Sequence, residues 1–170
     1  MIIKTLSLPL VAILFAIKSA DCAGLSPIYQ GEKDLFWQAY KDGKYVSACD
    51  GWKQLARKKD TVAEFNYGYC LEEGLHAKAR PAEASIWYGR AAEAGLAQAQ
   101  HNLALLRISG DNIRQDIILG YFWLIISSRT LGSSKKALTN LIREAKLTNQ
   151  QQLKLSQLLQ AYDYNMSRKK

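Results

Sequence analysis

The chain has few of the residues on which enzyme active sites and metal centres usually depend. Its 170 residues include two histidines, His76 and His101, and three cysteines. Neither histidine stands at a metal-ligand spacing from a cysteine, aspartate or glutamate. The sequence also lacks a G-x-S-x-G elbow, a phosphate-binding glycine loop and a zinc motif. It therefore gives no positive sign of catalysis, and we expect neither a cofactor nor a bound metal.

Long apolar runs are equally scarce, and the longest mostly apolar stretch extends from Leu6 to Ile17. It follows a positively charged start and precedes small residues, which is the layout of a secretory signal peptide. It is too short for a bilayer, which needs about 20 residues. We predict a signal peptide over residues 1–22, with cleavage after Cys22 and a periplasmic or secreted product without a transmembrane segment. A buried N-terminal helix is the alternative. Asp21 argues against a lipoprotein site at Cys22.

The balance of charge is basic, with a formal net charge of +8. Basic residues cluster at 57–59, 135–136 and 168–170. A basic surface favours acidic partners. Nucleic acid is not expected for an exported chain, whereas an acidic envelope polymer or an acidic protein fits. The competing interpretation is ordinary solubilising charge at helix ends.

A repeat of 36 residues organises what remains. Shifting the chain by this length brings Trp87 onto Trp123, Ala63 onto Ala99 and Gly74 onto Gly110. Each unit has two stretches of helical periodicity, and no stretch is typical of a strand. A single pair of helices cannot bury both of its faces, so the units must stack. We expect helices over residues 34–42, 45–58, 61–73, 81–94, 97–109, 115–130, 134–146 and 148–164.

Two motifs carry a family resemblance. They are Tyr67-Gly68-x-x-Leu71-x-x-Gly74 and Ala84-x-x-Trp87-Tyr88-x-x-Ala91-Ala92-x-x-Gly95-x-x-x-Ala99. They resemble the Sel-one-like repeat, a branch of the tetratricopeptide repeat superfamily, in its exported bacterial type. The resemblance implies an all-α solenoid, a right-handed superhelix of antiparallel helix pairs with C-terminal capping helices. Trp87, Tyr88 and the alanines are then expected to pack between units.

The same resemblance divides the chain. After the signal peptide we expect a lead-in over residues 23–33, the repeat domain over 34–164 and a basic tail over 165–170. Thr148 and Gln151 have the spacing of a capping box, which predicts the start of the final helix.

Two cysteines, Cys49 and Cys70, remain in the predicted mature chain. They lie about equally far before and after the turn near residues 59–60, so they face each other across an antiparallel helix pair. An exported protein meets an oxidising compartment. We therefore predict a disulfide between them, with two buried free thiols as the alternative.

The resemblance implies a non-catalytic scaffold that binds a protein or peptide on a concave surface lined by the first helix of each pair. Such a scaffold is an adaptor in the bacterial envelope or after secretion. Alternatives are a binder of an acidic envelope polymer, a cell-wall hydrolase and a secreted effector that engages host proteins. His101 is expected on a helix surface, and Glu72 and Glu73 in solvent. The candidate partner-binding residues are Glu64, Asn66, Glu73, Gln100, Asn102 and Arg107, for which plain solvated surface is the alternative.

Overall fold

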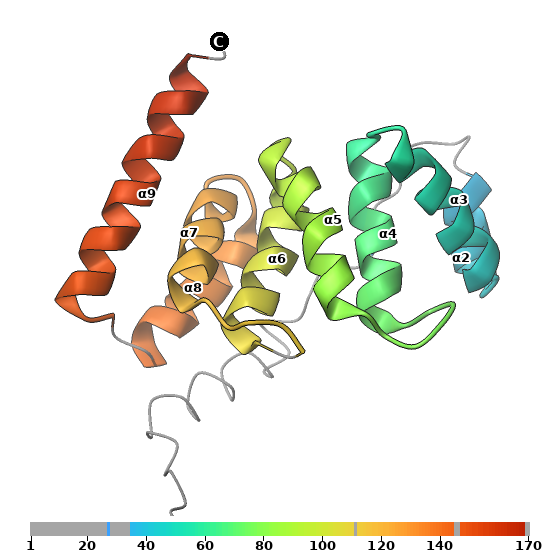
Figure 1. The fold of residues 1–170 in the computed structure, drawn as a ribbon, viewed down its shortest axis with the longest axis horizontal. Coiled ribbons are helices and arrows are strands. Elements are labelled where there is room, and N and C mark those ends of the chain that lie inside the picture. Colours follow the sequence, from blue (N-terminus) through green and yellow to red (C-terminus); the bar gives the residue numbers. More distant parts are fainter. Residues whose placement is uncertain (1–26, 28–34, 111, 145–146, 169–170) are drawn as a thin grey trace, which may run out of the picture.

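The computed structural model describes residues 27, 35–110, 112–144 and 147–168. The predicted signal peptide, the lead-in apart from Pro27 and the last two residues of the basic tail lie outside the described residues. The described parts contain helices and no strand (Figure 1). The helices are α2 (Leu35–Lys41), α3 (Tyr45–Arg57), α4 (Thr61–Glu73), α5 (Pro81–Glu93), α6 (Ala97–Ser109), α7 (Ile117–Ser128), α8 (Gly132–Glu144) and α9 (Asn149–Ser167).

These bounds agree closely with the predicted ones, and the differences have local causes. α7 begins at Ile117 because Asp116 caps it, its carboxylate accepting a hydrogen bond of 2.9 Å from the Leu119 amide. α5 begins at Pro81, a position where the missing N–H costs nothing. α9 starts with the predicted capping box of Thr148 and Gln151. It runs three residues beyond the predicted end, to Ser167.

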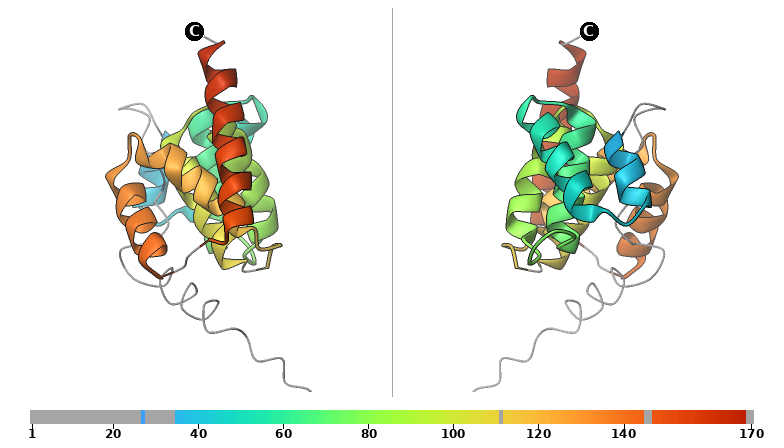
Figure 2. Two further views of the ribbon diagram at one scale, coloured as in Figure 1. Left: turned by 90° about the vertical axis from the view of Figure 1, so that its left-hand side faces the viewer. Right: turned by 90° about the vertical axis from the view of Figure 1, so that its right-hand side faces the viewer.

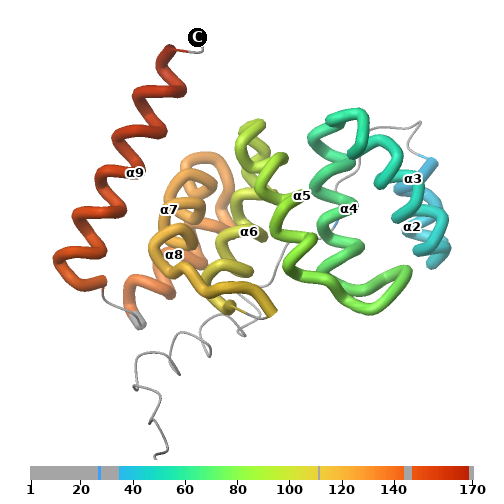
Figure 3. The backbone as a smooth tube through the Cα atoms, in the orientation of Figure 1, coloured from blue at the N-terminus to red at the C-terminus, as the bar shows by residue number. Residues whose placement is uncertain are grey.

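Helices α2 to α8 pack successively against one another in a row and α9 packs on α7, which makes the all-α solenoid that the repeat predicted. α2 and α3 lie at one end of the row and α9 at the other (Figure 3). The helices from α2 to α7 form pairs, with α2, α4 and α6 as the first helices and α3, α5 and α7 as the second, and α8 follows α7 in the place of a further first helix. α2 and α8 lie on the same side of the row in both views of Figure 2. We call this side, which the first helices form, the inner side.

Small residues set the spacing between helices in the core. Gly68 of α4 lies against the ring of Tyr88, and a Cβ atom at Gly68 would stand 2.7 Å from Cδ1 of that ring. Tyr88 is fully buried, as are Ala91 and Ala92 on the same helix. Close backbone approach and ring filling therefore occur together between the two helices of this unit.

The predicted disulfide is present between Cys49 on α3 and Cys70 on α4. Their Cα atoms lie 5.9 Å apart and both residues are buried. The bond closes a loop with a sequence separation of 21. Loop-closure entropy gives such a bond a stabilisation of about 3 kcal/mol. The disulfide thus joins the first helix pair to the second.

None of the described helices is both long enough and apolar enough to cross a membrane.

Candidate interaction surface

The inner side of the two central pairs is formed by matching stripes on α4 and α6. Residues at i, i+4, i+7 and i+11 lie on one face of a helix. The two stripes are related by the 36-residue repeat. We call these residues the inner surface. They are Val62, Asn66, Tyr69 and Glu73 on α4, and Gln98, Asn102, Leu105 and Ser109 on α6.

Contacts along the row show that the first helices are neighbours on this side. The ring of Tyr40 on α2 meets the ring of Tyr69 edge-on, with centroids 6.4 Å apart. His101 on α6 forms a hydrogen bond of 2.9 Å between Nδ1 and the Ser134 hydroxyl on α8. The opposite face of α4 instead contacts a second helix, because Tyr67 packs edge-on against Trp87 of α5 at 5.3 Å.

A buried polar cluster joins the two central pairs beside the inner surface. The Tyr88 hydroxyl donates a hydrogen bond of 2.8 Å to the Glu72 carboxylate. The Asn102 amide donates one of 3.2 Å to the same hydroxyl. Tyr88 belongs to α5, so its side chain connects α4 with α6. These three residues form what we call the tyrosine clasp.

Burial dominates the electrostatics of the clasp. It raises the pKa of Glu72 to about 7, with a further increase from the charge of Glu73, while the hydrogen bond from Tyr88 opposes the shift. Burial also raises the pKa of Tyr88 well above its usual value. Near neutral pH the Glu72 carboxyl is therefore partly protonated, whereas Tyr88 keeps its proton. The expectation that Glu72 is solvated surface is wrong. Glu73, its neighbour, is exposed as expected.

Three of the six candidate binding residues lie on the inner surface, namely Asn66, Glu73 and Asn102. Asn66 and Asn102 occupy equivalent repeat positions and are buried, whereas Glu73 is exposed. Their contact with a partner stays a prediction.

The other three candidates, Glu64, Gln100 and Arg107, lie outside the two stripes, and their contact with a partner stays a prediction. At 100° per residue they lie about half a helical turn away from the stripes. Gln100 is buried and donates to the Ala92 carbonyl at 3.1 Å. Glu64 is buried too, and burial raises its pKa against the opposing charge of Arg90.

Sequence reasoning also missed members of the inner surface, because it selected polar residues without applying the helical angle. Tyr69 and Leu105 stand at equivalent positions on α4 and α6 and form its aromatic and apolar part. Applying the 36-residue shift together with the helical period to Asn66 and Asn102 would have found them.

His101 was expected on a helix surface, and this is wrong, since both His101 and Ser134 are completely buried. A histidine beside a serine hydroxyl has the composition of a base and a nucleophile. Burial of both side chains keeps a substrate from this pair, so the contact is structural. Within the described ranges, no three His, Cys, Asp or Glu side chains converge to hold a metal ion.

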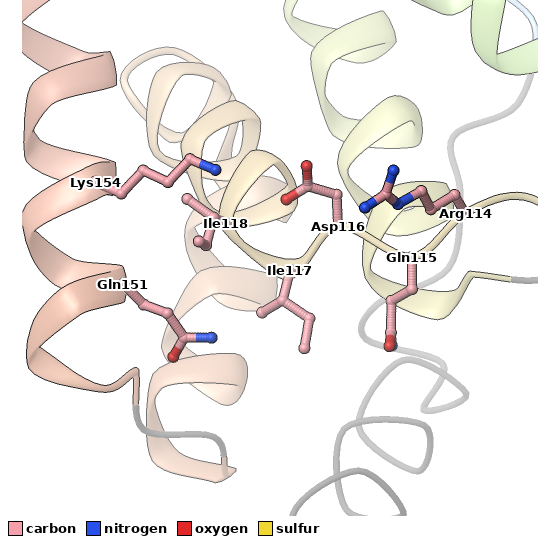
Figure 4. Close-up of a pocket in the computed structure, with 7 residues that line it drawn as sticks. All are labelled: Arg114, Gln115, Asp116, Ile117, Ile118, Gln151 and Lys154. Carbon is pink, nitrogen blue, oxygen red and sulfur yellow. The ribbon is translucent and has the colours of Figure 1, made fainter.

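A second feature is a cleft of about 290 Å³ at the start of α7 and α9. Arg114 and Lys154 border it. Neither forms an ion pair with an acidic residue in the described part of the chain. Asp116, the helix cap, is the acidic residue in its lining. Figure 4 shows the lining residues, which come from the α6–α7 connection, the start of α7 and the first turns of α9. The cleft is therefore polar, with a basic balance.

The row of paired helices defines the chain as an α-solenoid repeat protein. The family model described as the Sel1 repeat matches residues 61–96 and residues 97–129, so each match spans one central helix pair, α4–α5 or α6–α7. Residues 61–129 therefore consist of two Sel1 repeats, which are tetratricopeptide-like units that generally serve as scaffolds for protein–protein interaction. No curated protein and no solved structure matches the chain.

Proposed function

We propose that the protein is a non-catalytic adaptor that binds an extended peptide or protein segment along the inner surface. The observation that carries the proposal is the repetition of that surface. Asn66 and Tyr69 on α4 recur as Asn102 and Leu105 on α6, one helix pair along the row. Asn66, Asn102 and Leu105 are buried, so they lie beneath this surface. A ligand laid across successive first helices meets the more exposed equivalent positions, Val62 and Gln98 in one pair and Glu73 and Ser109 in the other.

We further propose that the adaptor works outside the cytoplasm, in the envelope or after secretion. Two features support this. Residues 1–22 have the composition of a signal peptide, and Cys49 and Cys70 form a buried disulfide of the kind that persists in oxidising compartments. Fractionation with sequencing of the mature N-terminus tests export. A cytoplasmic protein that starts at Met1 would contradict it.

Site-specific photo-crosslinking in cells tests the proposed surface. A photoreactive residue at Glu73 or Gln98 reports on the inner surface. The matched control is Ile86, which is 57% exposed on the second helix α5. We expect a defined crosslinked species from both inner positions and none from Ile86. The same species from all three positions, or from Ile86 alone, would contradict binding on the inner side.

The basic cleft favours a second candidate function, the binding of an acidic envelope polymer. Its support is the pair of cations, Arg114 and Lys154, that border one cleft without a described acidic partner. Joint replacement of both by alanine should weaken binding to an acidic glycan and reduce its salt dependence. Lys135→Ala, at an exposed position on α8, is the control. Equal effects of the control and the cleft variant would leave no role for the cleft.

A further inference from the structure

The cleft at the start of α7 and α9 holds two cations and one carboxylate. Arg114 and Lys154 border it, and Asp116 belongs to its lining. In Figure 4 the charged ends of Arg114 and Lys154 point toward the Asp116 carboxylate, which lies between them. Within the described part of the chain, neither cation forms an ion pair with this or any other carboxylate. Both cations are therefore open to an anionic ligand, but such a ligand must also fit beside Asp116.

The Asp116 carboxylate distinguishes a bare anion from an anion that carries hydroxyl groups. Its Oδ1 atom accepts the hydrogen bond of 2.9 Å from the Leu119 amide that caps α7, so the fold holds the carboxylate in place. Oδ2 forms no hydrogen bond with a described residue. A bare anion bound by the two cations meets the repulsion of this oxygen, whereas a hydroxyl group beside the anionic group of a ligand donates to it.

A further hydrogen-bonding residue, Gln151, lines the cleft from α9. Its Oε1 atom accepts a hydrogen bond of 2.9 Å from the Thr148 amide as part of the capping box. The NH2 group of Gln151 donates to no described residue, so it is left for a ligand. The cleft therefore offers a donor on Gln151 as well as an acceptor on Asp116. Hydroxyl groups, which both donate and accept, can satisfy the two together.

The lining also has an apolar part, and the cleft is small. Ile117 and Ile118 belong to the lining and both are half-buried, so part of their surface is open to the cleft. The volume of about 290 Å³ equals the share of about ten water molecules and lies at the lower end of the range for ligand pockets. A single sugar ring suits this size. The C–H groups on the face of such a ring gain from contact with isoleucine side chains.

We propose that the cleft binds one acidic sugar unit. The anionic group of the sugar contacts Arg114 and Lys154, its hydroxyl groups pair with Asp116 and Gln151, and one face of its ring covers the two isoleucines. The inference rests on the second candidate function, the binding of an acidic envelope polymer, and it names the unit of the polymer that the cleft recognises. Both cations are exposed, so a single unit should bind weakly, with a dissociation constant of about 1 mM.

NMR titration of the purified wild-type protein at low salt measures this binding, because salt screens exposed charges. The backbone amides of Ile117, Ile118 and Gln151 report on the cleft. The probes are glucuronate and glucose 6-phosphate, each beside its bare anion, acetate or inorganic phosphate, with glucose as the neutral sugar. Each acidic sugar should bind at least about fivefold more tightly than its bare anion, since it adds a hydrogen bond to a carboxylate and contact of its ring. Glucose should cause no shift.

Asp116→Asn separates the repulsion by the carboxylate from its role as an acceptor. Asparagine is as good an N-cap as aspartate, and its Oδ1 atom can keep the bond to the Leu119 amide, so α7 is preserved. The change removes the negative charge and replaces Oδ2 with an NH2 donor. Acetate should therefore bind more tightly to the variant, whereas glucuronate loses a hydrogen bond. The preference for glucuronate over acetate should fall at least about threefold.

Joint replacement of Arg114 and Lys154 by alanine should abolish the shifts, whereas Lys135→Ala, at an exposed position on α8, should leave them unchanged. Equal affinity for an acidic sugar and its bare anion would overturn the inference, as would an unchanged preference in Asp116→Asn. An acidic glycan chain that binds through Arg114 and Lys154, although no single acidic sugar binds, would also overturn it but leave the second candidate function intact. Absence of binding to every acidic glycan and every acidic sugar would refute both.

Discussion

Replacement of Glu72 by glutamine should remove a specific dependence of stability on pH. The carboxyl of Glu72 is held in the tyrosine clasp, where burial raises its pKa from 4.5 to about 7. The unfolded chain has the lower pKa. Between these two values the folded protein binds more protons than the unfolded chain, so the free energy of unfolding falls as pH rises from about 4.5 to about 7. Below and above this window the contribution of Glu72 is constant.

The pKa difference sets the magnitude. Each unit is equivalent to about 1.4 kcal/mol, so the full shift gives a loss of about 3 kcal/mol across the window. Because the side chain is half-buried and partly reached by solvent, we expect about 2 kcal/mol. An amide oxygen in Glu72→Gln still accepts the hydrogen bond from Tyr88 without carrying a charge. The variant should therefore match the wild type near pH 4 and exceed its stability by about 2 kcal/mol near pH 8.

Urea unfolding of both proteins at intervals between pH 4 and pH 8 measures the difference. Taking the difference between variant and wild type cancels the titration of all other groups. Glu73→Gln is the matched control, because Glu73 is the adjacent residue and is exposed. Its stability should differ from the wild type by less than about 0.5 kcal/mol at any pH. A difference between Glu72→Gln and the wild type that does not change with pH would refute the electrostatic account of the clasp.

Three further predictions concern stability and are measured by chemical denaturation. Joint replacement of Cys49 and Cys70 by serine should cost about 3 kcal/mol or more through lost loop closure, and a reductant should destabilise the wild type while leaving the variant unchanged. Gly68→Ala should cost about 1–3 kcal/mol because the added methyl meets a tyrosine ring at 2.7 Å. Gly89→Ala, where no atom lies within 4 Å of the added methyl, should instead stabilise the protein by about 0.5–1 kcal/mol; equal costs at both glycines would contradict the packing argument. Thr148→Ala should lose about 1 kcal/mol with the capping box, and no change would show that α9 does not depend on its cap.

The fold was predictable because the repeat and the helical period agree. Alanine and glycine recur at 36-residue intervals where helices touch. A glycine that ends a helix can be recognised from the local sequence, without knowledge of the tertiary structure. Gly74, Gly95 and Gly110 adopt positive φ angles at the ends of α4, α5 and α6. The disulfide followed from the same reasoning, because a hairpin of known turn position fixes which residues face each other.

The candidate surface was only partly predictable because polarity does not report exposure in a helix enclosed on several sides. Eight of the 13 residues of α4 are buried, among them Glu64 and Asn66. α4 packs against α3 and α5, so its polar residues enter contacts that depend on distant segments. The hydrogen bond from Tyr88 to Glu72 spans 16 residues of sequence, and the one between His101 and Ser134 spans 33. Such pairs are set by how the helix pairs stack, which no local pattern shows.

The disulfide also affects how the protein comes apart. In a row of helices each pair touches only its neighbours, so unfolding begins at the ends and proceeds inward. The bond ties α3 to α4 and prevents complete detachment of the end that α2 and α3 form. α9, with a single buried residue, has no covalent tie in the described structure. Unfolding should therefore begin at α9 rather than at the end that α2 and α3 form. Amide hydrogen exchange should be fastest in α9 and slowest in the central pairs.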